Sequence, residues 1–396
     1  MNMNEQMKES EESILHTYNR FPVVFEKGQG CYLYDSEGKE YLDFAAGIAV
    51  NSLGYHYPGY DEALKDQIDK LMHISNLYYN EPIIEAGAKL VKASKMSKAF
   101  FTNSGTEAIE GALKAAKKYA YVRDGHADHE IIAMNHSFHG RSIGALSVTG
   151  TAHYREPFEP LMGGVKFADF NDLESVKAQI TDKTCAIITE VVQGEGGIYP
   201  AKKEFLEGLR QICDEKDIML IFDEIQCGMG RTGHYFAWQA YGVQPDIMTS
   251  AKALGCGVPV GAFVLSEKAA KASLEPGDHG TTYGGNPFVC AAVSKVFDIY
   301  ENDKIIEHVQ EMTPYLEQKL DEIVAKHECA ATRRGMGFMQ GIVIQGRSVG
   351  EVVKAALAKG LLVISAGSDV LRIVPPLVIT KEHIDKMAAI LDECME

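Results

Sequence analysis

The chain has 396 residues, with hydrophobic (46%) and charged (24%) fractions that are ordinary for a folded globular protein. This length exceeds a single typical core, so we expect two or more domains. The net charge of −16, without a cluster of lysine and arginine, argues against nucleic acid or an anionic membrane surface as a partner. No apolar run approaches the roughly 20 residues that span a bilayer.

Residues 1–13 are polar and acidic and lack the basic-then-apolar pattern of a signal peptide. The eight cysteines are scattered without a CxxC spacing, which in a chain of this size indicates reduced thiols. The thirteen histidines show no HExxH spacing. We therefore expect a cytoplasmic protein without a structural metal centre.

The first segment, residues 1–59, contains alternating residues at 32–44 around a Ser-Glu-Gly-Lys turn, which predicts a β-hairpin. From residue 60 to residue 295, short apolar strands alternate with helices, and this pattern favours a mostly parallel sheet covered on both faces. Strands are expected at 99–102, 130–134 and 185–190 and in a run ending at residue 223, with helices at 106–121 and 205–216.

The last segment, residues 296–396, has a different pattern. Long helical stretches at 291–300, 305–326 and 349–359 enclose short strands at 341–344 and 371–374, which is typical of an α+β domain. We therefore predict an α/β protein with three parts. Residues 1–59 belong to a small domain, residues 60–295 form the large domain, and residues 296–396 form the C-terminal α+β domain.

Two residues at the ends of expected strands suggest a particular cofactor. Asp223 ends an apolar run, and Lys252 follows the strand or loop at 248–251 and precedes glycine-rich chain. A lysine that forms a Schiff base and an aspartate that holds a pyridinium nitrogen are the protein groups that pyridoxal phosphate needs most. Each residue also has an ordinary interpretation, because acidic residues often cap helices that follow strands and most lysines are solvated surface charges.

Other strand ends carry residues that fit the same ligand, since ligands of open α/β sheets bind beyond the carboxyl ends of the strands. Ser104, Gly105 and Thr106 open a helix, where small residues and free N–H groups attract phosphate. The alternative is a common serine or threonine cap. In the next loop, Phe138 could stack on a planar cofactor and Arg141 could hold a carboxylate, or they could be a packed phenylalanine and a surface arginine.

After the strand at 185–190, Glu195 stands among glycines, a pattern that usually marks only a turn. The order of these features is more informative than any one of them. A phosphate turn, an aromatic-arginine loop, a Glu-Gly loop, an Asp-x-x-Gln sequence and a lysine follow one another on successive strand ends. Together they favour a pyridoxal phosphate site.

With this combination the sequence resembles the class III, fold-type I pyridoxal phosphate aminotransferases, from residues 17–25 to residues 370–377. Within that family, residues 41–51 and 75–82 are most similar to the subgroup that acts on N-acetylornithine. The motifs that carry the resemblance are residues 103–108, 138–141, 222–226, 228–233, 251–255 and 277–287.

The resemblance implies a role for each matched residue. Lys252 would form the Schiff base and move the proton, and Asp223 would pair with the pyridine nitrogen and raise its pKa. Thr282 would reach the phosphate of a neighbouring subunit, which implies a homodimer with active sites at the interface. The other cofactor contacts would be Ser104, Gly105, Thr106, Phe138 (on the ring face), Glu190 and Gln226 (on the ring hydroxyl).

The resemblance also implies two substrates in one site, an ω-amine donor and 2-oxoglutarate, whose product glutamate reacts at its α-carbon. Arg372 would bind the α-carboxylate of glutamate, and Arg141 its distal carboxylate. With N-acetylornithine, Glu195 would pair with Arg372, because a desolvated arginine facing an apolar chain is costly. Thr281 matches a contact of that substrate, and Tyr18 matches a contact in ornithine aminotransferases.

Several alternatives remain at this stage. Ornithine, succinylornithine, 4-aminobutyrate and diaminopimelate-precursor aminotransferases belong to the same enzyme class. A non-catalytic regulator on this fold would not need Lys252, Asp223 and Arg372 together. An aminomutase of the same fold would not need the Arg372–Glu195 pair for a second substrate.

Overall fold

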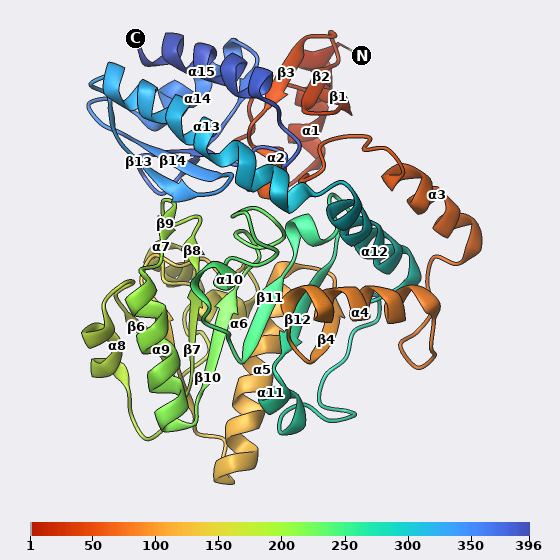
Figure 1. Ribbon diagram of the computed structural model, residues 1–396, viewed down its shortest axis with the longest axis vertical. Helices are drawn as coiled ribbons and strands as arrows, with labels where there is room; N and C mark the ends of the chain where they lie inside the picture. Colours follow the sequence, from red (N-terminus) through yellow and green to blue (C-terminus); the bar gives the residue numbers. More distant parts are fainter. Residues whose placement is uncertain (1) are drawn as a thin grey trace.

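The structure is a computed structural model that describes residues 2–396, and it has a large and a small lobe (Figure 1). A seven-stranded sheet of order β4-β12-β11-β10-β7-β5-β6 forms the centre of the large lobe. Only β12 runs antiparallel to its neighbours, so the predicted mostly parallel sheet is confirmed. The strands are β4 Lys98–Thr102, β5 Glu130–Met134, β6 Val165–Ala168, β7 Thr184–Glu190, β10 Met219–Asp223, β11 Ile247–Ser250 and β12 Gly261–Leu265.

Helices cover both faces of this sheet, as the alternation of strand side chains requires. In β10, Met219 and Ile221 pack with α5 Gly105–Asp124 on one face. Leu220 and Phe222 belong to the cluster that includes the buried face of α9 Lys203–Lys216 on the other. The large lobe also contains α6 Ile143–Ser147, α7 Ala152–Arg155, η1 Glu156–Phe158, α8 Leu173–Gln179, β8 Val192–Gln193, β9 Tyr199–Pro200, α10 Trp238–Tyr241, η2 Lys252–Leu254 and α11 Glu267–Lys271.

Both ends of the chain contribute to the small lobe, where the N and C termini lie at the same end of the molecule (Figure 1). The predicted hairpin at 32–44 is confirmed as β2 Tyr32–Asp35 and β3 Glu40–Asp43, which extend to β1 Phe25–Gln29. The C-terminal strand β15 Leu361–Leu362 pairs with β3. A second sheet contains β13 Ala330–Met336, β14 Met339–Ile344, β17 Val370–Ile373 and β16 Ile364–Ala366.

The remaining helices flank the two lobes. The C-terminal helices predicted from the sequence are present with small shifts at their ends. The expected boundary at 295/296 falls within α12, and the domain boundaries stay a prediction. The helices are α1 Met3–Ser13, α2 Ala46–Ala49, α3 Tyr60–Lys70, α4 Glu81–Ser94, α12 Pro287–Asn302, α13 Ile305–Lys326, α14 Val349–Ala358 and α15 Lys381–Met395.

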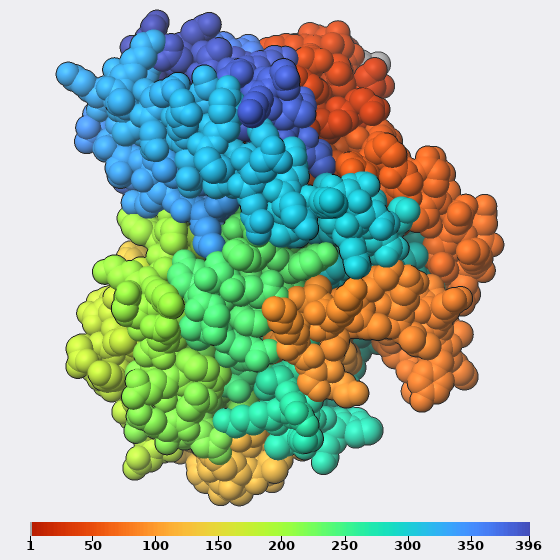
Figure 2. Space-filling model, in the orientation of Figure 1, coloured from red at the N-terminus to blue at the C-terminus, as the bar shows by residue number. Residues whose placement is uncertain are grey.

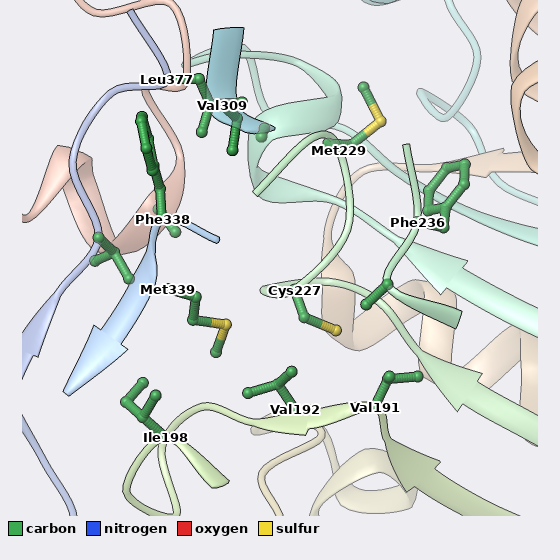
Figure 3. Packing of buried hydrophobic residues seen from close by; sticks show 14 of the residues in the cluster. Val191, Val192, Ile198, Cys227, Met229, Phe236, Val309, Phe338, Met339 and Leu377 are labelled. Atoms are coloured by element: carbon green, nitrogen blue, oxygen red, sulfur yellow. The ribbon is translucent and has the colours of Figure 1, made fainter. Parts of the chain in front are cut away.

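Apolar packing joins the two lobes next to the carboxyl end of the central sheet. Figure 3 shows Val192 and Ile198 from the segment after β7 facing Met339 of β14. Phe338 and Leu377 continue the same buried cluster. This contact holds the small-lobe sheet, including β17, against the edge of the central sheet at which its parallel strands end. No helix in the described part of the chain is long and apolar enough to cross a membrane.

Candidate active site

A pocket of about 450 Å³ lies where the parallel strands of the central sheet end. Because β4, β5, β7, β10 and β11 run in one direction, the residues that follow them meet at one edge. The pocket brings together nine residues that the sequence placed in a cofactor or substrate site. They are Ser104, Gly105, Thr106, Phe138, Arg141, Glu190, Asp223, Gln226 and Lys252.

Lys252 follows β11 and begins the short helix η2. Its φ of 48° lies in the left-handed region, which non-glycine residues seldom occupy unless the surroundings enforce it. Burial of the amine lowers the pKa of Lys252 to about 8, and Arg372 adds to the shift, while nearby carboxylates oppose it. A substantial fraction of this amine is therefore neutral near physiological pH, as a nucleophile or proton acceptor requires.

Asp223 ends β10 and is 3% exposed. One of its oxygens lies 2.7 Å from His139 Nδ1, and the other accepts from Ile225 N (3.0 Å) and Thr249 Oγ1 (3.3 Å). These contacts fix the direction of the carboxylate at the pocket wall. His139 was not singled out from the sequence, because a histidine inside an aromatic-glycine loop carries no spacing signal for this contact.

Glu190 stands directly beside Asp223, because β7 and β10 pair these two residues. Burial, followed by the neighbouring Asp223 carboxylate, raises the pKa of Glu190 well above its ordinary value. Glu190 still accepts hydrogen bonds from the backbone N–H groups of Phe138 (3.3 Å) and Gly194 (3.2 Å). Glu190 thus ties the two loops together beside Asp223.

The start of α5 forms the anion-binding end of the pocket. Ser104 caps the helix by accepting from Glu107 N, so the chain enters α5 in extended conformation. At Gly105 a Cβ would come 2.9 Å from Ile225, which shows how closely the backbone approaches the wall. Thr106 Oγ1 accepts from Ser142 N at 3.2 Å. A 20-residue helix that presents its first N–H groups to the cavity suits a phosphate.

Arg372, on β17 of the small lobe, is 3% exposed and faces the central sheet. Its guanidinium forms a two-pronged ion pair with Glu195, in which Nη2 lies 3.3 Å from Oε2. Gln226 joins the pair, accepting from Arg372 at 3.1 Å and donating to Glu195 at 3.4 Å. The sequence-based pairing of Arg372 with Glu195 is therefore present, and Gln226 connects it to the pocket.

Arg141 has different surroundings. It is exposed, and its guanidinium carbon lies 4.1 Å from the ring centre of Tyr154 and 5.3 Å from that of Phe138. No carboxylate among residues 2–396 lies within ion-pair distance of Arg141. Tyr154 was not among the residues that sequence reasoning identified, because nothing in its spacing links it to Arg141.

Five predicted residues do not line this pocket: the Arg372–Glu195 pair described above, and Thr281, Thr282 and Tyr18. Thr281 and Thr282 line a neighbouring cavity with Asn103 and Glu107, and Asn103 Nδ2 lies 3.3 Å from Thr281 Oγ1. Tyr18 is 71% exposed on the segment before β1. A single chain does not test whether these residues reach a second subunit's site, so their roles stay predictions.

The pocket residues fit pyridoxal phosphate on structural grounds. A helix start suits its phosphate, a buried carboxylate suits its ring nitrogen, and an amine of lowered pKa suits its aldehyde. Phe138, beside Asp223 through the Glu190 contact, offers an aromatic face.

Comparison with known proteins identifies the family of this chain. The family model described as aminotransferase class-III matches residues 14–395. An acetylornithine aminotransferase of Clostridium acetobutylicum is 47% identical, covering 98% of this chain and 100% of the relative. A succinylornithine transaminase of Yersinia pseudotuberculosis is 44% identical over 94% and 92%, respectively. An ornithine aminotransferase structure from Toxoplasma gondii, described with partial occupancy of PLP at its active site, superimposes with TM-score 0.95, 28% identity and coverage of 100% and 94%.

The fold and the site define an enzyme that transfers amino groups. The chain belongs to the class III aminotransferases, as its match over residues 14–395 shows. It is a pyridoxal phosphate-dependent transaminase of fold type I, and the fold class expected from the sequence is confirmed.

Proposed function

We propose that this enzyme transfers the ω-amino group of N-acetylornithine to 2-oxoglutarate, giving N-acetylglutamate semialdehyde and glutamate, a step of arginine biosynthesis. The observation that carries the proposal is the Arg372–Glu195 ion pair beside Lys252. An enzyme whose two substrates both react at a carbon bearing an α-carboxylate would not need to mask this arginine. The acetylornithine aminotransferase of Clostridium acetobutylicum, 47% identical over nearly the full length, supports the same donor.

Each pocket residue has a role in this reaction. Bound pyridoxal phosphate withdraws electrons from the carbon that bears the reacting amine, so that this carbon can lose a proton. Lys252 Nζ, with its pKa near 8, accepts that proton and delivers it. Asp223, oriented by His139, holds the ring nitrogen, while Ser104, Gly105 and Thr106 hold the phosphate. Phe138, Glu190 and Gln226 complete the cofactor contacts.

The two arginines let one site bind both substrates, because each arginine has a different partner in the two complexes. With N-acetylornithine, Glu195 stays on Arg372, and Arg141 binds the α-carboxylate. With glutamate, the α-carboxylate replaces Glu195 on Arg372, and the distal carboxylate takes Arg141. Arg372 thus has a negatively charged partner in both complexes. This partner is needed because a buried arginine without one costs several kcal/mol. Thr281 is assigned to the donor substrate, and Tyr18 would matter only if ornithine were the donor.

A panel of single-turnover reactions tests the proposal. The holoenzyme is mixed separately with N-acetylornithine, N-succinylornithine, ornithine, 4-aminobutyrate and glutamate, and the cofactor absorbance is followed. We expect N-acetylornithine to be the fastest ω-amine and glutamate to react as well. N-succinylornithine is the strongest competitor, because a transaminase with that name is 44% identical to this chain. A faster reaction with any other ω-amine would refute the choice of donor.

The proposal includes a homodimer. It also places the protein in the cytoplasm, which agrees with its eight free cysteines. Large apolar side chains are exposed on the segment after α3, including Leu77 (86%) and Tyr79 (96%). This segment contacts the loop that carries Thr281 and Thr282, through Asn76 Nδ2 to Gly284 O (2.9 Å). Figure 2 shows the region around residues 60–90 (orange) on the outer surface of the molecule.

Mass measurement in solution tests the dimer, and mixing tests the shared site. Subunits carrying Lys252→Ala are combined with subunits carrying Thr282→Ala. If Thr282 serves the partner's site, mixed dimers place both defects in one site and leave the other site intact. Activity should then rise above that of either parent. A monomer in solution, or mixtures no more active than their parents, would refute the shared site.

A further inference from the structure

Tyr154 provides the main contact of the carboxylate-binding Arg141 in this structure. The guanidinium carbon lies 4.1 Å from the centre of the Tyr154 ring, closer than to Phe138 at 5.3 Å. Tyr154 also meets Phe138 edge to face, with ring centres 6.0 Å apart and planes at 80°. The ring of Tyr154 therefore lies against both the residue assigned to the substrate carboxylate and the residue assigned to the cofactor ring.

The chemistry of this contact suits a carboxylate site. An aromatic face attracts a guanidinium without using its N–H groups, whereas an acidic partner would occupy them. Arg141 forms no ion pair with any carboxylate in the described residues 2–396. Its N–H donors are thus oriented by stacking and remain available for an incoming carboxylate.

The backbone that carries Tyr154 is itself anchored. The neighbouring Arg155 stacks on Phe167 of β6 at 4.1 Å and donates to Thr149 O. Thr151 Oγ1 donates to Ser137 O (3.4 Å), in the loop that precedes Phe138. These contacts hold the short helix α7 against the edge of the central sheet. The backbone that carries the Tyr154 ring is consequently held in place by its neighbours.

We propose that Tyr154 is a positioning residue for substrate binding, which pre-orients Arg141 for the carboxylate of both substrates. The inference rests on the proposed role of Arg141. Only the ring is required, because the Tyr154 hydroxyl has no hydrogen-bond partner among residues 2–396. Since Arg141 serves N-acetylornithine and glutamate alike, loss of the ring weakens both substrates equally, unlike any change at Glu195.

Kinetics of two variants test the proposal. Tyr154→Leu removes the ring and should raise the KM for N-acetylornithine and for glutamate by about threefold to tenfold, the scale of a partly exposed cation–π contact, with kcat within about twofold. Tyr154→Phe keeps the ring and should restore wild-type KM values. A fall in kcat with unchanged KM, or a phenylalanine variant as impaired as the leucine variant, would overturn the proposal. Thermal melting and cofactor absorbance of each variant report whether it folds.

Binding of glutarate, measured by calorimetry, separates this proposal from the role of Arg141. Glutarate affinity is compared in the wild type, Tyr154→Leu, Arg141→Gln and the double variant. If Tyr154 acts through Arg141, replacing Tyr154 lowers the affinity for glutarate when Arg141 is present. The same replacement has no further effect on the affinity once Arg141 is changed. Equal effects in both backgrounds would overturn the proposal. An unchanged affinity in Arg141→Gln alone would instead refute the assignment of Arg141, and neither result depends on which ω-amine the enzyme prefers.

Discussion

The two arginines assigned to substrate carboxylates are held in opposite ways. Arg372 comes from the small lobe, is 3% exposed, and has its charge matched by Glu195. Arg141 comes from a loop of the central sheet, is exposed, and lies on aromatic rings. A buried arginine needs a counter-charge when no substrate carboxylate is present, whereas water can solvate an exposed one. Only Arg372 can therefore be switched between a masked and an available state, while Arg141 stays open to a carboxylate at all times.

Replacing Lys252 with alanine should slow both half-reactions equally. Without the amine neither half-reaction can move its proton, so both rates should fall by more than about 10⁴-fold. The protein should still fold and bind pyridoxal phosphate noncovalently, because the helix start and Asp223 remain. Single-turnover rates, a thermal melt and the cofactor absorbance check this. Normal turnover with an unchanged, pH-sensitive cofactor spectrum would contradict the assignment.

Replacing Glu195 with glutamine should affect the two half-reactions differently. Arg372 would then lack a counter-charge when N-acetylornithine binds, and that half-reaction should slow by about 1–3 kcal/mol, on the order of 5- to 150-fold. The glutamate half-reaction should be retained or improved, because its α-carboxylate no longer displaces Glu195. The measurement is the single-turnover rate with each substrate.

A matched control is available outside the pocket. Glu317 pairs with Arg333 at 3.2 Å, between α13 and β13 of the small lobe. Glu317→Gln removes another glutamate–arginine pair and should leave both half-reactions unchanged. Equal losses in both half-reactions of the Glu195 variant would reduce Glu195 to a structural turn residue.

The Arg141 end should discriminate between N-acetylornithine and ornithine. The acetylated amine is uncharged, whereas the free α-amino group of ornithine carries a positive charge and would lie near Arg141. No carboxylate among residues 2–396 pairs with Arg141 and could balance that added charge. We expect a preference for N-acetylornithine of at least about tenfold in kcat/KM, or roughly 1.4 kcal/mol. Both amines are measured with 2-oxoglutarate at one pH. A preference for ornithine or 4-aminobutyrate would refute the donor and leave the transaminase chemistry intact.

The smallest effect is expected from pH. Burial would by itself raise the pKa of Glu195, but the charge and hydrogen bonds of Arg372 lower it below its ordinary 4.5. Because the folded pKa is depressed, the carboxylate keeps its charge above pH 4.5 and loses it only below that value. The ratio of the two half-reactions should therefore stay within about twofold between pH 8 and 5.5.

The Glu195→Gln variant is the control for this measurement, since it has no carboxylate to titrate. The ratio of half-reaction rates in this variant should also stay constant with pH, although its value differs from that of the wild type. A wild-type ratio that shifts toward glutamate on acidification, while the variant's ratio does not, would show that Glu195 is protonated in this range.

The sequence alone was enough to identify functional residues at the ends of strands in the central sheet. Asp223 ends a short apolar run, and Ser104 and Lys252 each stand two residues after the end of a strand. Parallel strands end at one edge, so their order along the chain was enough to bring them into one site. The alternation of strands and helices likewise predicted the layered sheet, because each element's period sets which face it buries.

The contacts that orient those residues depend on the tertiary structure. The family resemblance predicted that Arg372 pairs with Glu195, and apolar packing of the small lobe on the large one brings the two side chains together. The bond of His139 to Asp223 and the ring of Tyr154 over Arg141 depend on side-chain directions between segments far apart in the chain. Neither the spacing nor the hydrophobic period of a sequence encodes such directions, since they follow from how complete elements pack.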